Sequence, residues 1–417
     1  MNYFKPISIS LSPNVEKDDV KLALNLILRP WLWKNGKQIK ILEEEFKKYL
    51  GVKYAFSFNS GRSCLYAILK SLEIKKNNDV LLQAFTCNAS INPFLWSNLN
   101  PIYVDCNKDD YNIDIEDLKN KITSQSKIVM IQHTFGMPAN IDEVLKICKE
   151  NNLILIEDCA HSLGAEFNGK KVGTFGKAGF FSFSRDKIVS SVYGGMVVTN
   201  DDIIGKNLEK LQKEFDLPNR FWIFQQLLHP VLLHFIILPI YNFFDLGKIM
   251  LIFSQITHIL SKAVNWKEKK GLKPNYFPKS LPNALATLAL NQFSKLEKFE
   301  MQRKNIAESY FAELENSKFI LPAKFPERKN VFLRFTIRHK DAHQIIYEAW
   351  HKKNILLGDW YTTVIAPHDT NLEKMHYKTG DCPNAESLAK QTLNLPTHIN
   401  ISKKDFVRII NFLKQWR

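Results

Sequence analysis

The chain has 417 residues, of which 45% are hydrophobic, 12% aromatic and 24% charged. This composition excludes a globally disordered protein and provides enough apolar side chains for a large core, which we expect to be divided between one large domain and a smaller one. The formal net charge of +15 indicates affinity for anions such as phosphates, nucleotides or an anionic membrane surface; because no DNA-reading motif accompanies it, we expect no nucleic-acid partner.

The six cysteines form no CxxC pair and have no histidine cluster beside them. We therefore expect neither a metal site nor a disulfide framework, and reduced thiols favour a cytoplasmic location. The first residues, MNYFKPISISLSPN, contain no apolar stretch of the kind found in signal peptides, which favours the same location.

The first half of the chain alternates short apolar runs with helical patterns. Buried strands are predicted at 54–58, 79–85, 100–106, 127–136 and 153–160, and helices at 63–74 and 141–152. Two more apolar runs, 179–184 and 194–200, predict a hairpin. Because strands that alternate with helices form crossover connections, this order predicts an α/β fold with a mixed, mostly parallel sheet.

After Asp202 the alternation ends, and the segment 221–264 is unusually apolar and aromatic. A helix that spans a membrane needs about 20 uninterrupted apolar residues. Pro230 and Pro239 interrupt this run, so we expect apolar helices that do not span. A basic stretch, KEKKGLK, follows at 267–273.

The last third of the chain predicts one long helix over 283–314, a strand at 332–338, and helices at 341–354 and 403–416. We expect a large domain from 1 to 318, with an apolar helical insertion at about 215–270, and a small C-terminal α/β domain from 319 to 417.

Ligands of open parallel sheets bind at the carboxyl ends of the strands, which directs attention to four loops. In the first, NSGRS (59–63), the residues Ser60, Gly61 and Arg62 connect a strand to a helix. The free N–H groups and positive dipole end of such a helix can hold a phosphate, although a simple helix cap by Ser60 explains the same residues.

The second loop, IEDCAHSLGA (156–165), places Asp158 at the end of an apolar strand and His161 three residues later. A buried carboxylate needs a partner, which is either a protonated ring nitrogen of a ligand or a neighbouring Arg or Lys. His161 by itself is more typical of a hydrogen-bonded structural histidine than of a catalytic one.

The third loop, FSFSRDKIVSSVYGG (181–195), carries Lys187 between two strands. Most such lysines are solvated, but a lysine held in a lined cleft can form a Schiff base. The fourth loop, QAFTCNAS (83–90), carries Phe85 and Cys87. The ring of Phe85 could stack on a flat ligand, and packing in the core explains it equally well.

Together these loops offer a phosphate-binding turn, a carboxylate at a strand end and a lysine 29 residues after it. Pyridoxal 5'-phosphate needs this set of groups. The carboxylate keeps the pyridine nitrogen protonated so that the ring acts as an electron sink, the lysine forms an imine, and the helix N-terminus holds the phosphate.

At these residues the sequence resembles the DegT/DnrJ/StrS family of pyridoxal-phosphate-dependent sugar aminotransferases. The similar blocks follow one another over most of the chain, at 40–69, 156–187, 291–310 and 393–410. The resemblance implies the fold of the aspartate aminotransferases, pyridoxal 5'-phosphate as the cofactor, and a homodimer whose sites lie at the subunit interface.

The resemblance also implies roles for single residues. Lys187 corresponds to the imine-forming lysine, Asp158 to the carboxylate at the pyridine nitrogen, and His161 to the residue that contacts the phenolic oxygen of the cofactor. These three residues are the predicted catalytic set, and they are also predicted to bind the cofactor.

Further cofactor contacts are implied at the phosphate. Ser182 corresponds to a phosphate-binding serine, and the turn from Ser60 to Arg62 corresponds to the family's Ser-Gly-Thr turn. Asn275, in PNYFP, is a weak match for an asparagine that reaches the phosphate of the neighbouring subunit.

The sequence departs from the family pattern in several places. Arg62 stands where Thr is usual, and Cys87 stands where many members carry the ring that stacks on the cofactor, with Phe85 as the possible substitute. The lysine loop has SRDK in place of the commoner HPTK, and the connection 203–274 is longer than usual.

The activity implied by the resemblance is transfer of an amino group from an amino acid, typically glutamate, to a keto-sugar that is nucleotide- or lipid-linked, in surface polysaccharide or glycan biosynthesis. Members that dehydrate the sugar lack the imine lysine, so Lys187 argues against that branch. Two alternatives stay open: another chemistry of the same cofactor, such as dehydration, and a non-catalytic, partner-binding member, which Arg62 and Cys87 allow.

The apolar segment 221–264 suggests one more interaction. Its prolines limit helix length, and its aromatic residues with the nearby KEKK suit helices that lie on a membrane interface. We expect this segment to touch an anionic membrane surface, or a membrane-bound partner, at the inner face of the membrane. The alternative is an enlarged dimer interface or an additional core element.

Overall fold

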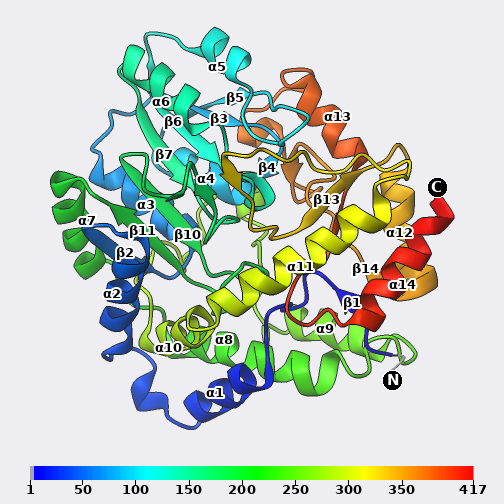
Figure 1. Cartoon of the computed structure of the whole chain (residues 1–417). Coiled ribbons are helices and arrows are strands. Elements are labelled where there is room, and N and C mark those ends of the chain that lie inside the picture. The colour runs from blue at the N-terminus through cyan, green and yellow to red at the C-terminus, as the bar shows by residue number, and fades with distance from the viewer. Residues whose placement is uncertain (1–3, 417) are drawn as a thin grey trace.

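A computed structural model describes residues 4–416 and has a seven-stranded sheet at its centre (Figure 1). The strands of this sheet are β2 (Tyr54–Phe58), β3 (Asp79–Gln83), β5 (Asn100–Val104), β6 (Ser126–Gln132), β7 (Ile154–Asp158), β10 (Ala178–Ser182) and β11 (Gly195–Thr199). They lie in the order β2-β11-β10-β7-β6-β3-β5, and only β11 runs antiparallel to its neighbours. The predicted mixed, mostly parallel sheet is therefore confirmed.

Helices cover both faces of the sheet, so both faces are buried. Because alternate side chains of a strand point to opposite faces, each strand contributes to two apolar cores. In β3, Leu81 belongs to one apolar core, while Val80 and Leu82 belong to the other. The helices that contribute to the first core include α1 (Lys17–Ile27), α2 (Gln38–Leu50), α5 (Ile115–Lys121), α6 (Ile141–Glu150), α8 (Arg220–Leu232) and α10 (Asn283–Phe293). Those that contribute to the second include α3 (Gly61–Ser71), α4 (Asn88–Trp96), α7 (Asp202–Glu214) and α13 (Pro383–Gln391).

A third apolar core lies in the C-terminal part of the chain. Its elements are α11 (Leu296–Leu314), β13 (Phe335–Arg338), α12 (Ala342–Lys353), β14 (Ile355–Leu356), β16 (Thr392–Leu395) and α14 (Lys403–Leu413), joined by β1 (Ile7–Ser8), which pairs with β14. A further short pair, β4 (Thr86–Cys87) with β15 (Ile365–Ala366), brings this part of the chain against the loop after β3. The domain boundary at 318 stays a prediction.

The remaining elements are short. They are the strands β8 (Glu166–Phe167), β9 (Lys170–Lys171) and β12 (Arg328–Lys329), and the helical turns η1 (Pro30–Leu32), η2 (Thr134–Gly136), η4 (Glu268–Lys270), η5 (Glu373–Met375) and η6 (Lys414–Trp416).

The helix predicted over 283–314 is wrong as a single helix, because α10 ends at Phe293 and α11 begins at Leu296. At the break, the Lys295 amide bonds to the carbonyl of Gln292 in a tighter turn. The Lys295 ammonium lies 2.9 Å from carboxylate oxygens of both Asp18 and Asp19. These long-range ion pairs fix the turn, and no Pro or Gly in the sequence marks it.

The apolar segment forms α8, the π-helical turn η3 (Leu233–Ile237) and α9 (Leu246–Ile256). The helix α8 packs against α1 and α10, so this half of the segment is part of the large core. The rest has a small core of its own, formed by Leu233, Ile237, Tyr241 and Leu260. Within residues 4–416, none of the helices combines the length and the apolar character that crossing a membrane requires.

Candidate active site

A cavity of about 250 Å³ lies at the carboxyl ends of the sheet strands, between α3, the loop after β10 and residues 359–368 of the C-terminal part. Eight of the ten predicted site residues line it: Ser60, Gly61, Arg62, Cys87, Asp158, His161, Ser182 and Lys187. These residues are far apart in the sequence, and they meet because parallel strands end at one edge of a sheet.

Asp158 is the last residue of β7 and only 2% exposed. Its carboxylate accepts a hydrogen bond from the Ser90 hydroxyl (2.8 Å) and one from the Ala160 N–H (2.9 Å). Burial raises the pKa of Asp158, while these two bonds and the nearby Lys187 ammonium act in the opposite direction. A cationic group placed in the cavity would complete the pairing of this carboxylate.

Lys187 follows β10, and its side chain reaches the same cavity as Asp158. Burial lowers the pKa of the Lys187 ammonium, and Arg334 lowers it further, although Asp186 and Asp158 oppose this shift. The backbone of the lysine is held in place because the Asn14 amide donates to the Lys187 carbonyl (2.6 Å). A positioned amine with a lowered pKa is suited to nucleophilic attack on a carbonyl group.

The N-terminus of α3 forms the third wall of the site. The Ser60 side chain caps the helix by accepting the Ser63 N–H (3.0 Å). The backbone is closely packed there, because a Cβ on Gly61 would lie 3.2 Å from the Cβ of Ser182 and one on Gly195 would lie 2.9 Å from the Gly61 nitrogen. The end of an 11-residue helix, with the Ser182 hydroxyl beside it, is suited to a phosphate.

Arg62 is buried and forms an ion pair with the buried Glu268. Although burial opposes a charge, Glu268 raises the pKa of the guanidinium above its ordinary value. The same side chain donates to the Ala263 carbonyl (3.2 Å) and lies 4.5 Å from the ring centroid of Phe277. Glu268 therefore neutralises the positive charge of Arg62, the residue that stands where the family usually has Thr. The contacts of Arg62 also connect α3 to the segment 263–268.

His161 is buried and stacks on Trp360, with 5.0 Å between the ring centroids. Its Nδ1 accepts the Phe135 N–H (3.3 Å), so we assign the ring hydrogen to Nε2. Burial lowers the pKa of His161 well below its ordinary value, and the neighbouring Lys187 and Arg334 add to this effect. The residue is therefore a neutral hydrogen-bond donor at physiological pH.

Two predicted residues lie outside the lining of the cavity. Phe85 is completely buried and packs against Tyr111, Phe135 and Tyr361, so its ring is not available to stack on a ligand in the cavity. Asn275 is exposed and does not line the cavity of its own chain. A contact of Asn275 with a second subunit stays a prediction.

Sequence reasoning missed two residues of the site. Ser90 lies inside the quoted motif QAFTCNAS, and its position one helical turn beyond Cys87 could have identified it. Trp360 comes from the C-terminal part, and its ring centroid lies 4.2 Å from the Lys187 Nζ and 3.3 Å from the Arg334 guanidinium carbon. No local pattern marks Trp360 as part of the site.

The donor set in the cavity fits pyridoxal 5'-phosphate. An amine, a buried carboxylate, a neutral histidine donor and a helix N-terminus each match one functional group of that molecule. Among residues 4–416, the carboxylate accepts hydrogen bonds from two donors, the Ser90 hydroxyl and the Ala160 N–H, and both donors are uncharged. It can therefore still accept a proton-bearing nitrogen of a ligand.

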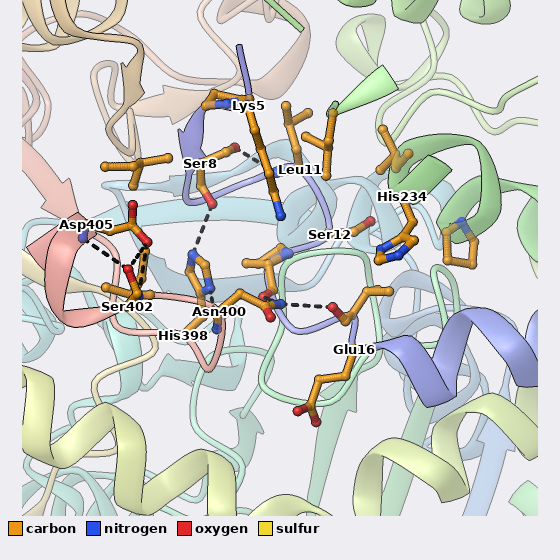
Figure 2. Close-up of a pocket in the computed structure, with 18 of the residues that line it drawn as sticks. Lys5, Ser8, Leu11, Ser12, Glu16, His234, His398, Asn400, Ser402 and Asp405 are labelled. Atoms are coloured by element: carbon orange, nitrogen blue, oxygen red, sulfur yellow. Dashed lines mark hydrogen bonds between the residues drawn. The ribbon is translucent and has the colours of Figure 1, made fainter. Parts of the chain in front are cut away.

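A larger cavity, of about 820 Å³, lies between the N-terminal segment, the apolar insertion and the C-terminal part (Figure 2). None of the predicted site residues lines it. Lys5 points into this cavity, with His234 and His398 on either side.

The sequence matches the model of the DegT/DnrJ/EryC1/StrS aminotransferase family over residues 14–217 and 261–414. A GDP-perosamine synthase of Caulobacter vibrioides is 26% identical over 406 residues, which cover 97% of this chain and 96% of that protein. An uncharacterised protein of Methanocaldococcus jannaschii is 27% identical over 416 residues, covering 97% and 96% of the two chains.

Among solved structures, the fold is similar to that of a Helicobacter pylori aminotransferase involved in the biosynthesis of pseudoaminic acid. The TM-score is 0.76 at 23% sequence identity, and the match covers 99% of both chains.

Proposed function

The chain belongs to the DegT/DnrJ/EryC1/StrS aminotransferase family, whose members are pyridoxal-phosphate-dependent, and from this premise we propose that it transfers an amino group from an amino acid to a keto-sugar. The proposed donor is glutamate. The proposed acceptor is a nucleotide- or lipid-linked sugar used for surface polysaccharide or glycan biosynthesis, a class supported by the GDP-perosamine synthase relative.

When bound, pyridoxal 5'-phosphate would supply an electron sink next to the substrate carbon. Lys187 would be its point of covalent attachment, and Asp158 would hold the ring nitrogen in its protonated form. Ser60, Ser182 and the N-terminus of α3 would hold the phosphate, and the Nε2–H of His161 would donate to the phenolic oxygen.

Lys187 would also move protons. Burial lowers the pKa of this amine and so favours its neutral form, which can accept a proton from a substrate carbon and return it at a neighbouring atom. Trp360, against which the Lys187 Nζ lies, would limit the paths open to that amine and keep water from it.

We further propose a homodimer in the cytoplasm. The free state of the six cysteines supports a reducing compartment. The exposed Asn275 would be available to the site of a second subunit.

The observation that carries the proposal is the presence of Lys187 and Asp158 in one cavity together with the N-terminus of α3. Purified protein loaded with pyridoxal 5'-phosphate should convert glutamate to 2-oxoglutarate, detected by mass spectrometry, and then aminate one member of a panel of nucleotide- and lipid-linked keto-sugars. The matched control is Lys187→Ala, which removes the amine and leaves the phosphate-binding residues unchanged.

Lys187→Ala should lose both the absorbance of the covalently bound cofactor and turnover. A Lys187→Ala enzyme that still turns over would disprove the assignment. Release of the sugar's hydroxyl as water, without transfer of nitrogen, would instead establish a dehydratase.

A further inference from the structure

The helix α9 exposes a broad apolar face. The inner side of α9 packs closely against η3 at Gly247, where an added Cβ would lie 2.3 Å from the Ile237 carbonyl oxygen. The outer side carries five apolar residues at the i, i+3, i+4, i+7 and i+10 spacing of one helix face: Leu246, Ile249, Met250, Phe253 and Ile256. Phe253 is 60% exposed and Ile256 is 65% exposed, which is unusual for residues of this size.

The turn before α9 extends this face. Phe244 is 82% exposed, and Phe243 next to it is also exposed. The Phe243 ring packs edge-on against Phe4 at 5.0 Å between centroids, and the Asn242 N–H donates to the Phe4 carbonyl (3.1 Å). The apolar face therefore continues to the N-terminal segment, directly before Lys5.

Amphipathic residues border the face on the side of α12. The Lys248 Nζ lies 5.5 Å from the ring centroid of Trp350, which is itself exposed. Tyr347, one turn earlier on α12, is exposed as well. Trp, Tyr and Lys are the residue types that anchor proteins at the level of lipid headgroups.

The cavity of Figure 2 adds positive charge at the N-terminal border of the face. Lys5 and Lys17 both line this cavity, and neither forms an ion pair with any residue between 4 and 416. The carboxylates of the wall are already engaged by other groups: Glu16 with Lys298, Asp18 with Lys295, and Asp405 with the Ser402 hydroxyl. The wall also contains Lys404 and Arg408, while Asp405 is its one carboxylate without a cationic partner among residues 4–416, so the cavity carries a net positive charge beside Leu233 and Leu238 of the insertion.

The charge of this region decides between two possible occupants of the face. On the face itself, Asp245 and Lys248 pair with each other at 2.7 Å, so the positive charge beside the face comes from Lys5 and Lys17. If two copies met face to face here, these lysines of both copies would come together, and their like charges would repel. An anionic bilayer would attract the two lysines and would also bury the apolar residues.

We propose that the α9 face, defined as residues 243–256, docks this protein on an anionic phospholipid bilayer. Its apolar side chains enter the boundary between headgroups and acyl chains, and Lys5 and Lys17 contact lipid phosphates. This inference goes beyond the aminotransferase function, because the face lies in the part of the insertion between the two segments that match the family. A helix of 11 residues lies on such a surface and does not cross it.

Flotation of the full-length protein with vesicles tests the docking. Vesicles of phosphatidylcholine with phosphatidylglycerol should carry the wild type to the top of the gradient, and vesicles of phosphatidylcholine alone should carry far less. The double variant Phe253→Glu/Ile256→Glu should lower the partition coefficient by about tenfold or more, since it places two charges in the docking face. Lys5→Glu/Lys17→Glu should lower it by a similar factor, and added salt should weaken wild-type binding.

Two matched controls separate the face from general effects of charge. Ile203→Glu/Met301→Glu changes two equally exposed apolar residues elsewhere, and Lys21→Glu/Lys40→Glu reverses two exposed lysines of α1 and α2. Both should float like the wild type, and all variants should keep the wild-type circular dichroism spectrum. If the wild type stays unbound to anionic vesicles, the proposal is overturned. If Phe253→Glu/Ile256→Glu instead splits an oligomer in light scattering without changing flotation, the face is a subunit interface and the proposal is equally overturned.

Discussion

The hydrogen bond from Ser90 to Asp158 allows a quantitative prediction. A hydrogen bond to a charged group contributes about 1.5–3 kcal/mol, and one pKa unit corresponds to about 1.36 kcal/mol. Removing the hydroxyl with Ser90→Ala should therefore raise the pKa of the Asp158 carboxyl by about one unit, at the lower end of this range because water can replace part of the bond. Burial already raises that pKa, so the carboxyl would stay protonated to a higher pH.

A protonated Asp158 cannot hold a cationic ring nitrogen by charge. The acid limb of the pH profile of kcat for the glutamate half-reaction should therefore move upward by about one pH unit in Ser90→Ala, with little change above neutral pH. Ser90→Thr is the control, because it keeps the hydroxyl at the same position of α4. An acid limb that is the same in Ser90→Ala as in the wild type, or that moves as far in Ser90→Thr, would refute the assigned role of this hydrogen bond.

Two other perturbations test buried charges. Arg62→Ala leaves the Glu268 carboxylate buried without its partner and should lower the free energy of unfolding by about 3–5 kcal/mol, measured by urea denaturation. The double variant Arg62→Met/Glu268→Leu should recover most of this loss. A double variant as unstable as the single one would contradict the ion-pair explanation. Glu157→Ala should cost about 3 kcal/mol or more, because the carboxylate accepts the N–H groups of Gly173, Phe175 and Gly176 at 2.7 Å each. Burial opposes ionisation of Glu157, but the hydrogen bond and charge of His133, together with the backbone N–H groups, hold the pKa of Glu157 below its ordinary value. The stabilising contribution of Glu157 is therefore present above the ordinary value and is lost as the pH falls through the lowered pKa. Wild-type unfolding should show this acid dependence, and Glu157→Gln should lack it.

Much of the architecture could be predicted from the sequence because it rests on regular, local patterns. Apolar runs of strand length alternate with helical periodicity, and this alternation fixed the sheet, its mostly parallel order and the loops at its carboxyl edge. The blocks around Asp158 and Lys187 indicated the family and the cofactor, and both predictions are confirmed. The roles of the individual site residues stay predictions.

The contacts that complete the site were decided by the tertiary structure alone. Arg62 and Glu268 are separated by 206 residues in the sequence. Trp360 reaches Lys187 from the other end of the chain, and the ion pairs of Lys295 interrupt a helix that its own periodicity predicts as continuous. Such contacts depend on how distant elements pack, and packing leaves no periodic trace in either segment. The same reason applies to α9: its sequence shows that it is apolar, but only its position against η3 decides which of its side chains remain exposed.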